Sequence, residues 1–267
     1  MSPADPVLVG CAHGTKDPAG RRALAQLRLQ IAALRPGLTV LAASVDVQKP
    51  GLDDVVARLS AAGQRCVVVP LLLSAGYHVA VDVARAVAAS GGLAVAASAL
   101  GPDDALAQVL AQRLDEAGSG PRDEVVLGAA GSTDPRAVAD VEAVAGLLAA
   151  RRGAPVATAY LSAATPGIAE AVAAARARLL SRTPAPHLSS VATIDSTNST
   201  NSAGETGGAG ETGSPGVAVA TYLLAPGFFA DRLAGCAADR VSAPLGAHPL
   251  LADLALRRYD QALATVA

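Results

Sequence analysis

The chain has 267 residues, of which 51% are hydrophobic and only 2% aromatic, and its formal net charge is −2. A chain of this length forms one large α/β domain or two smaller ones, and the scarcity of aromatic residues means that Ala, Val and Leu must build the core. The charge lacks the basic excess of a nucleic-acid-binding protein. No apolar run approaches the roughly 18 residues that a membrane span needs, so we expect neither nucleic acid nor a membrane as a partner.

The three cysteines, Cys11, Cys66 and Cys236, are too few and too scattered for a disulfide framework or an iron–sulfur cluster. Two of them border apolar, strand-like runs, which is typical of reduced thiols in a protein core. The sequence begins MSPADP, without the basic and apolar regions of a signal peptide. We therefore expect a cytoplasmic protein.

Residues 7–18, VLVGCAHGTKDP, combine a buried strand with a polar loop and a helix start. The apolar run predicts the strand, Asp17 is placed to cap the following helix, and Pro18 suits the first helical position. His13 is therefore predicted at the carboxyl end of a strand. In an open α/β sheet this edge is where ligands bind, because the strand-to-helix loops and the helix N-termini converge there.

Strand and helix patterns then alternate along the first half of the chain. After the first helix, which the run Arg35-Pro36-Gly37 ends, strands are predicted at residues 38–47, 66–73 and 93–100, and helices at 52–59, 79–89 and 102–117. The continuous apolar run at 66–73 is typical of a parallel strand buried on both faces, and it leads to a second histidine, His78. These patterns predict four β–α units.

The second half of the chain repeats the first. Residues 125–135 match the stretch around His13, and residues 156–166 match 40–50, at offsets of 117 and 116 residues. Further along, residues 217–229 match the run ending at His78, and residues 243–246 match 98–101, at offsets of 151 and 145 residues. The offset jumps once, across residues 183–216, whose Ser, Thr, Asn and Gly content predicts a disordered surface insertion. We expect an α/β fold of two duplicated lobes, residues 1–120 and 121–267, each a four-stranded parallel sheet flanked by helices, with a cleft between them.

Two imidazoles and a carboxylate are the candidate chemical groups of the first lobe. His13 and His78 follow the first and third predicted strands, and Asp46 lies near the end of the second. This set suits a divalent ion such as cobalt, ferrous iron, nickel or zinc, and an imidazole also accepts protons near neutral pH. Metal binding and base catalysis both remain open at this point, and so does a purely structural role for the histidines in their loops.

The two copies of the repeat carry different side chains at the positions of the candidate metal ligands. Ala130, Ser162 and Phe229 occupy the positions of His13, Asp46 and His78, so we expect the second lobe to bind no metal. His187 lies in the predicted insertion, and His248 is expected near the start of the last helix in a structural role. Cationic side chains near the first loops, available to an anionic ligand or simply exposed to solvent, are Lys16, Arg21, Arg22 and Arg85.

The motifs AHGTKDP and VVVPLLLSAGYH, together with the repeated Leu-Gly loops, resemble the sirohydrochlorin chelatases of the CbiX/SirB type, in the class II chelatase superfamily. The resemblance covers both lobes and breaks only at the insertion. It implies an ATP-independent lyase that inserts cobalt or ferrous iron into sirohydrochlorin, in the biosynthesis of cobalamin or sirohaem. It also implies that no cofactor is tightly bound, because the divalent metal is a substrate.

The resemblance assigns roles to individual residues. His13 and His78 would be the catalytic and metal-binding histidines, and Asp46 would be a third metal ligand where the family commonly has a glutamate. Sirohydrochlorin would contact three residues, Lys16, Tyr77 and Phe229. A non-catalytic carrier of tetrapyrrole or metal is the alternative function, and the sequence decides neither the metal nor the oligomeric state.

Overall fold

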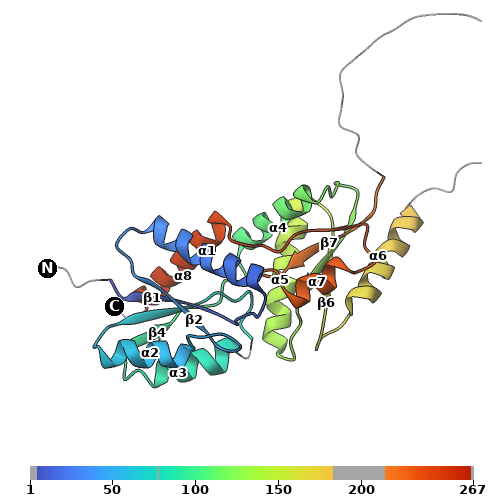
Figure 1. Cartoon of the computed structure of the whole chain (residues 1–267). Coiled ribbons are helices and arrows are strands. Elements are labelled where there is room, and N and C mark those ends of the chain that lie inside the picture. The colour runs from blue at the N-terminus through green and yellow to red at the C-terminus, as the bar shows by residue number, and fades with distance from the viewer. Residues whose placement is uncertain (1–4, 77, 183–213, 266–267) are drawn as a thin grey trace, which may run out of the picture.

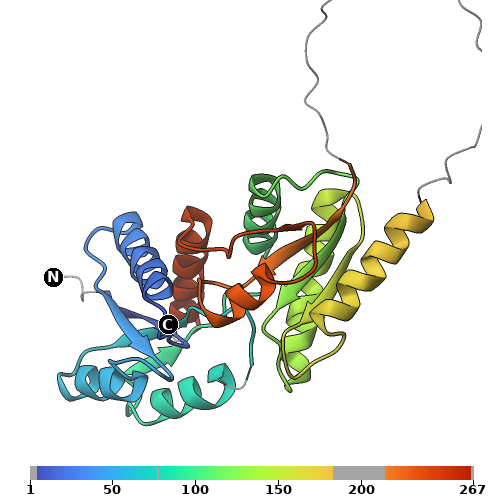
Figure 2. The same ribbon diagram turned by 45° about the vertical axis from the view of Figure 1, so that its right-hand side comes forward.

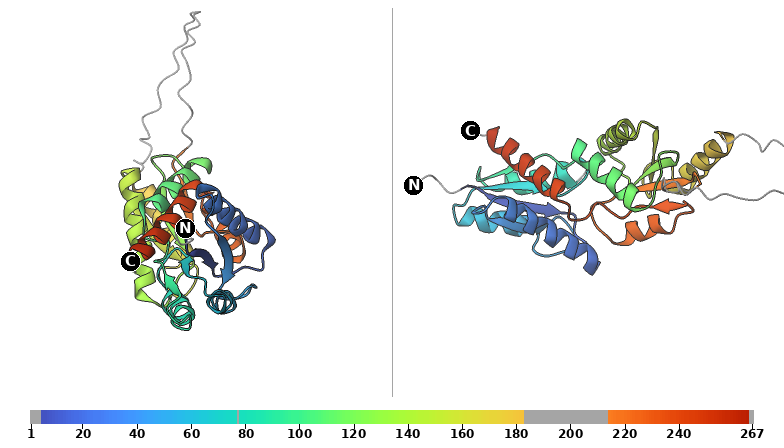
Figure 3. Two further views of the ribbon diagram at one scale, coloured as in Figure 1. Left: turned by 90° about the vertical axis from the view of Figure 1, so that its left-hand side faces the viewer. Right: turned by 90° about the horizontal axis from the view of Figure 1, so that it is seen from above.

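The computed structural model describes residues 5–76, 78–182 and 214–265, and only the backbone of residues 78–80. Two four-stranded sheets form the body of the protein, and Figure 3 shows them end to end. The strand orders are β2-β1-β3-β4 and β6-β5-β7-β8, and every pairing is parallel. We call the two sheets with their sequence-adjacent helices the first and second lobes. The predicted duplicated α/β fold is confirmed.

The helices and strands follow the predicted alternation (Figure 1). The first lobe contains β1 (Val7–Ala12), α1 (Pro18–Leu34), β2 (Val40–Ser44), α2 (Leu52–Ala61), β3 (Cys66–Pro70), the π-helix η1 (His78–Val83), α3 (Ala84–Ala88), β4 (Ala94–Ala96) and α4 (Asp104–Glu116). The second contains β5 (Glu124–Ala129), α5 (Pro135–Arg152), β6 (Val156–Tyr160), α6 (Ile168–Arg182), β7 (Val217–Tyr222), α7 (Phe228–Ala234), β8 (Arg240–Val241) and α8 (Pro249–Ala264).

The first helix of each lobe begins in the same way, for reasons that are local. The Asp17 carboxylate accepts the N–H groups of Ala19 and Gly20 at 2.6 and 3.0 Å, and Pro18 occupies the first helical position of α1. Asp134 caps α5 by accepting the N–H of Arg136 at 2.9 Å. These caps satisfy free N–H groups at the N-termini of α1 and α5, which begin a few residues after the carboxyl ends of β1 and β5.

The fourth helix of each lobe packs on the opposite lobe. Helix α4 packs against α5 and β7, and α8 packs against α1 and β3, as Figures 1 and 2 show. One apolar cluster therefore joins both sheets, with Leu8 and Val67 from the first and Leu127 and Ala220 from the second. The predicted division of the chain at residue 120 separates the two repeats of the sequence, but it does not separate their packing.

Several predicted strands and helices are longer than those in the structure. Strand β3 ends at Pro70 rather than at residue 73, and β4 spans only Ala94–Ala96. The predicted helix at 79–89 is instead η1 followed by the short α3. The apolar residues beyond these strands lie in loops, where Leu71 and Leu100 are fully buried. The N–H of Leu100 donates to the Leu72 carbonyl oxygen at 2.9 Å, outside the paired strands. Burial alone therefore does not mark the end of a strand.

Most of the predicted insertion, residues 183–213, lies outside the described residues. Within the described ranges, no helix is both long enough and apolar enough to cross a membrane.

Candidate functional site

Three loops that carry the predicted site residues meet at one edge of the first sheet. Strand β1 pairs with both β2 and β3, so its loop lies between theirs. His13 follows β1 directly and is exposed. The N–H of Asp46 donates to the carbonyl oxygen of His13 at 3.1 Å, and the neighbouring Val45 N–H donates to the Ala12 carbonyl at 3.1 Å. The backbone thus places His13 and Asp46 side by side.

The His13 loop is held by side chains that the sequence analysis did not single out. The amide oxygen of Gln48 accepts the N–H of Thr15 at 2.8 Å, and the Thr15 hydroxyl accepts the N–H of Asp17 at 3.1 Å. A Cβ atom on Gly14, whose φ is +100°, would lie 2.7 Å from the Asp46 carbonyl oxygen. The loops after β1 and β2 are therefore packed closely, and only the hydrogen-bonding capacity of Gln48 and Thr15 could have indicated their roles.

His78 does not directly follow its strand. After β3 the N–H of Leu71 donates to the Cys11 carbonyl at 2.7 Å, and residues 71–76 then form a loop that leads to η1, which begins at His78. Single-turn π-helices are common at functional sites. The side chain of His78 and all of Tyr77 lie outside the described residues, so the roles predicted for both stay predictions.

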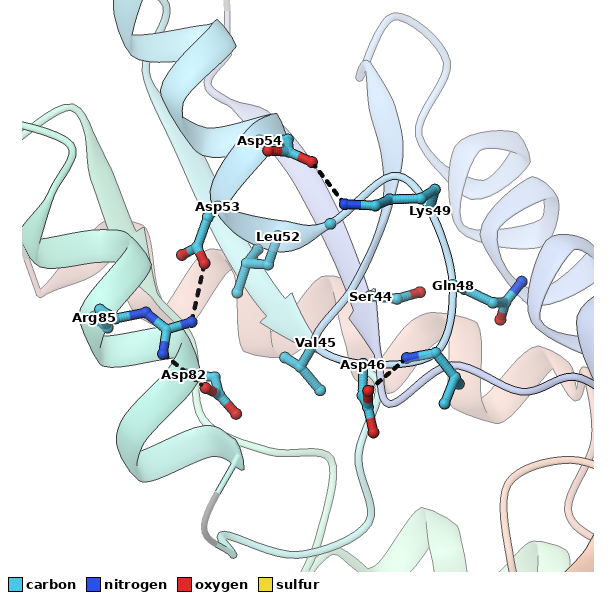
Figure 4. Close-up of a pocket in the computed structure, with 12 residues that line it drawn as sticks. Ser44, Val45, Asp46, Gln48, Lys49, Leu52, Asp53, Asp54, Asp82 and Arg85 are labelled. Carbon is cyan, nitrogen blue, oxygen red and sulfur yellow. Dashed lines mark hydrogen bonds and ion pairs between the residues drawn. The ribbon is translucent and has the colours of Figure 1, made fainter.

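A pocket of about 380 Å³ lies between the loop after β2, the start of α2 and η1 (Figure 4). Its charged lining consists of Asp46, Lys49, Asp53, Asp54, Asp82 and Arg85. Arg85 pairs with Asp53 at 2.9 Å and with Asp82 at 3.1 Å, and Lys49 pairs with Asp54 at 3.3 Å. The pairing of Arg85 favours a structural role over binding an anionic ligand. The excess of carboxylates makes the surroundings of Asp46 favourable for a cation.

The second lobe has the same backbone arrangement with different side chains. The N–H of Ser162 donates to the Ala130 carbonyl at 3.0 Å, which corresponds to the bond between Asp46 and His13. A Cβ atom on Gly131 would likewise collide with the Ser162 carbonyl. Because methyl and hydroxyl groups replace the imidazole and carboxylate, these positions lack the ligand types of the first lobe.

The two aromatic residues at the start of α7 are exposed. Phe228 is 71% exposed and Phe229 37%, with ring centroids 5.6 Å apart. The preceding Gly227 lies beside the His13 loop, since a Cβ atom on it would be 3.5 Å from the Thr15 hydroxyl oxygen. The start of α7, which carries two exposed rings, therefore lies next to the loop that carries His13.

In each lobe a loop at the strand ends touches the first helix of the other lobe. A Cβ atom on Gly20 would lie 2.5 Å from the Pro226 carbonyl oxygen, and one on Gly76 would lie 3.7 Å from the Cβ of Ala137. The pocket described above lies within the first lobe, so the cleft expected between the lobes stays a prediction.

The structure also places four other residues that the sequence analysis considered. His248 caps α8, with its Nδ1 accepting the N–H of Leu250 at 3.2 Å, as expected. Arg21 donates to the Thr15 carbonyl at 3.0 Å. Burial raises the pKa of the Cys11 thiol to about 12, which keeps it protonated and a poor ligand. Lys16 is exposed on the His13 loop, where it remains available to an anion.

No three histidine, cysteine or acidic side chains come close enough to bind a metal together among the residues whose side chains the structure describes. That search does not include the imidazole of His78. The predicted ligand set of His13, His78 and Asp46 therefore stays a prediction. The structure shows the adjacent backbones of His13 and Asp46 and the course of residues 71–76 after β3.

The fold and site define a class: two-lobed α/β proteins with a polar strand-end site in one lobe and an apolar counterpart in the other. The CbiX family model matches residues 7–117 and 124–184, and the chain belongs to the CbiX family. No curated protein matches the chain.

Solved structures share the whole fold. SirB from Bacillus subtilis with Fe3+ has a TM-score of 0.71 at 18% identity, covering 97% of this chain and 96% of that one. The sirohydrochlorin chelatase SirB of Bacillus subtilis subspecies spizizenii, in complex with cobalt, has a TM-score of 0.65 at 16% identity, with coverages of 96% and 94%. A multi-domain Deinococcus radiodurans protein with structural similarity to chelatases has a TM-score of 0.55 at 19% identity, with coverages of 95% and 54%. At these identities the matches show the fold.

Proposed function

We propose that this protein is a sirohydrochlorin chelatase that inserts a divalent metal ion, cobalt or ferrous iron, into the macrocycle. The observation that carries the proposal is the position of the His13, Asp46 and His78 loops on three neighbouring strands of a CbiX-family protein. The two SirB structures, described with Fe3+ and with cobalt, support it through their common fold. We infer that the metal is a substrate and that no cofactor is resident.

The chemistry requires a weak metal site and a proton acceptor. Insertion removes water from the ion, removes two protons from pyrrole nitrogens of the ring, and forms bonds between the metal and the ring nitrogens. His13 and His78 would bind the ion and accept those protons, since an ordinary imidazole titrates near neutral pH. Asp46 would add one negative charge beside the His13 backbone. Because the ion has to leave its protein ligands, a loose set of three suits the reaction better than a closed tetrahedral site.

The second lobe would bind the ring rather than the ion. The exposed rings of Phe228 and Phe229 offer an apolar surface for one face of a tetrapyrrole. Lys16 is exposed on the first lobe, where it can pair with a carboxylate of the substrate. Ring distortion, supported by such remote contacts, typically involves about 1–5 kcal/mol of strain.

The test is the change in the absorption spectrum of sirohydrochlorin when it is mixed with purified protein and either cobalt or ferrous iron. We expect metallation faster than the spontaneous reaction, with many turnovers per chain, and a large loss of rate in His13→Ala and His78→Ala. His248→Asn is the matched control, because it removes an imidazole but keeps a side chain that can cap α8.

Three outcomes would overturn the proposal or the roles it gives to the histidines. A rate equal to the spontaneous reaction would exclude a chelatase, and tight stoichiometric binding of sirohydrochlorin or metal without turnover would identify a carrier. Unchanged rates in both histidine variants, with thermal stability reduced instead, would assign the histidines a structural role. The relative rates with cobalt and iron would show which metal is preferred.

A further inference from the structure

The loop that leads to His78 is held in place by the second lobe. The carboxylate of Asp140, on α5, accepts the main-chain N–H of Ala75 at 2.7 Å. This bond joins residues 65 positions apart in the sequence, from opposite lobes. The same stretch of α5 also contacts the next residue, since a Cβ atom on Gly76 would lie 3.7 Å from the Cβ of Ala137.

A second bond between the lobes holds the same loop two residues earlier. The hydroxyl of Tyr222, at the end of β7, donates to the Leu73 carbonyl oxygen at 2.8 Å. Tyr222 is only 2% exposed, and burial raises its pKa, so the hydroxyl remains a donor at every physiological pH. The approach is close: a Cβ atom on Gly101 would lie 2.2 Å from that carbonyl and 2.6 Å from the hydroxyl. A glycine is therefore required beside this bond.

These two bonds hold the main chain of Leu73 and Ala75, within the described loop that approaches η1. Beyond the bond from Leu71 to Cys11 of β1, residues 72–76 pair with no strand of the sheet, so strand β3 alone does not set where η1 begins. Ligand and base geometry must be held to within about 0.5 Å to be productive, and such precision comes from the residues that support the loop. The second lobe supplies that support from two separate elements, α5 and β7.

We propose that Asp140 and Tyr222 are positioning residues that place His78 for metal binding and proton transfer. The inference rests on the proposed function. It gives the second lobe a role in the chemistry of the first lobe in addition to any contact with the macrocycle. Neither residue touches the ion or the ring; both act through the backbone of residues 73–75.

The variants are Tyr222→Phe, which removes one hydroxyl, and Asp140→Ala, with Asp140→Asn as the conservative form that keeps an oxygen acceptor. Tyr259→Phe is the matched control for the tyrosine, because the Tyr259 hydroxyl is also in a buried residue and donates to the Pro6 carbonyl at 2.6 Å, at the opposite end of β1. Glu142→Ala is the control for the aspartate, since Glu142 is exposed on the same helix. All measurements use the full chain.

Cobalt binding is measured by titration calorimetry, and kcat and KM for sirohydrochlorin are measured with cobalt as the metal. We expect Tyr222→Phe and Asp140→Ala to weaken cobalt binding and lower kcat by about tenfold or more, the effect typical of residues that orient a metal ligand. KM for sirohydrochlorin should stay near the parent value. Asp140→Asn should recover most of the loss, and both controls should behave like the parent.

A second measurement separates positioning from general stability. In a His78→Ala background, Tyr222→Phe should cause no further loss of cobalt affinity, whereas in a His13→Ala background it should still cause one, because coupled residues are not additive. Equal additional losses in both backgrounds, or parent-like affinity and kcat in both single variants, would overturn the inference while leaving the chelatase intact. A parent protein that neither binds cobalt nor metallates sirohydrochlorin would overturn the proposed function first.

Discussion

The main-chain amide of Asp46 donates a hydrogen bond to the carbonyl oxygen of His13, and the two atoms are 3.1 Å apart. The second lobe repeats this bond between Ser162 and Ala130 at 3.0 Å. The duplicated backbone therefore does not depend on the identity of these side chains. The imidazole and carboxylate of the first lobe are additions to a loop pair that folds without them, which is why their substitution should affect chemistry more than stability.

Asp46→Ser places the side chain of the second lobe at this position. We expect cobalt affinity to fall by about tenfold or more, since loss of a ligand should cost at least as much as loss of an outer-shell partner. The free energy of unfolding should change little, because the main-chain bond remains and the bond that the carboxylate accepts from the Val47 N–H at 2.8 Å is exposed, so water can replace it. Asp54→Ser is the control: Asp54 lines the same pocket but pairs with Lys49. Calorimetric titration with cobalt measures the affinity, and equal affinities in the two variants would remove Asp46 from the ligand set.

Gly14→Ala should disturb the contact between the His13 and Asp46 loops. Its φ of +100° is costly for alanine, by about 1–3 kcal/mol, and its Cβ would also lie 2.7 Å from the Asp46 carbonyl oxygen. Gly37→Ala is the matched control, because its φ is +93° but no atom lies within 4 Å of the added Cβ. Urea unfolding should show a larger loss of stability for Gly14→Ala. Equal losses would mean that the loop moves aside at no cost.

Phe229→Ala should weaken tetrapyrrole binding without changing metal affinity. An aromatic contact contributes roughly 0.5–1.5 kcal/mol beyond its buried area, and Phe229 is 37% exposed with Phe228 beside it. His78→Ala should do the reverse. Leu180→Ala, which removes another exposed apolar side chain from α6, serves as the control. Calorimetry with cobalt should find one site per chain in the parent; a second equivalent metal site, or loss of metal affinity in Phe229→Ala, would contradict the division of roles between the lobes.

The capping role of His248 should make stability depend on pH. Burial, and then the charge of Arg113, lower the pKa of His248 below its usual 6.5. The unfolded chain therefore binds a proton more readily than the folded one as pH falls through about 6.5. The stabilisation is present above that pH and is lost as pH falls toward the folded-state pKa, where protonated Nδ1 no longer accepts the Leu250 N–H.

His248→Ala is the variant that measures this effect. It should cost about 1 kcal/mol at about pH 8, the usual value of an N-cap, and less at about pH 5. His248→Asn, which caps at both pH values, should remove the dependence on pH. Thermal melts at the two pH values test this, and a His248→Ala cost that is larger at the lower pH would contradict the sign.

The sequence alone determined the architecture of the protein. Short-range rules sufficed for the Asp17 and Pro18 helix start and for the buried strand before His13, because caps and apolar periodicity act within a few residues. The internal repeat then predicted two copies of one sheet. Because parallel strands align their carboxyl ends, the loops carrying His13 and Asp46 had to lie at the same edge.

Only the tertiary structure showed which side chains hold those loops in place and how the two lobes pack together. Nothing local marks Gln48, Asp140 or Tyr222, since each acts on a backbone group that is distant in sequence. The sequence also does not show that α4 and α8 each pack on the opposite lobe. The pattern of an amphipathic helix indicates which of its faces is buried but not which sheet that face covers. Side chains that bond to remote backbone atoms leave no periodic signal, so they emerge only when packing brings their partners within hydrogen-bonding distance.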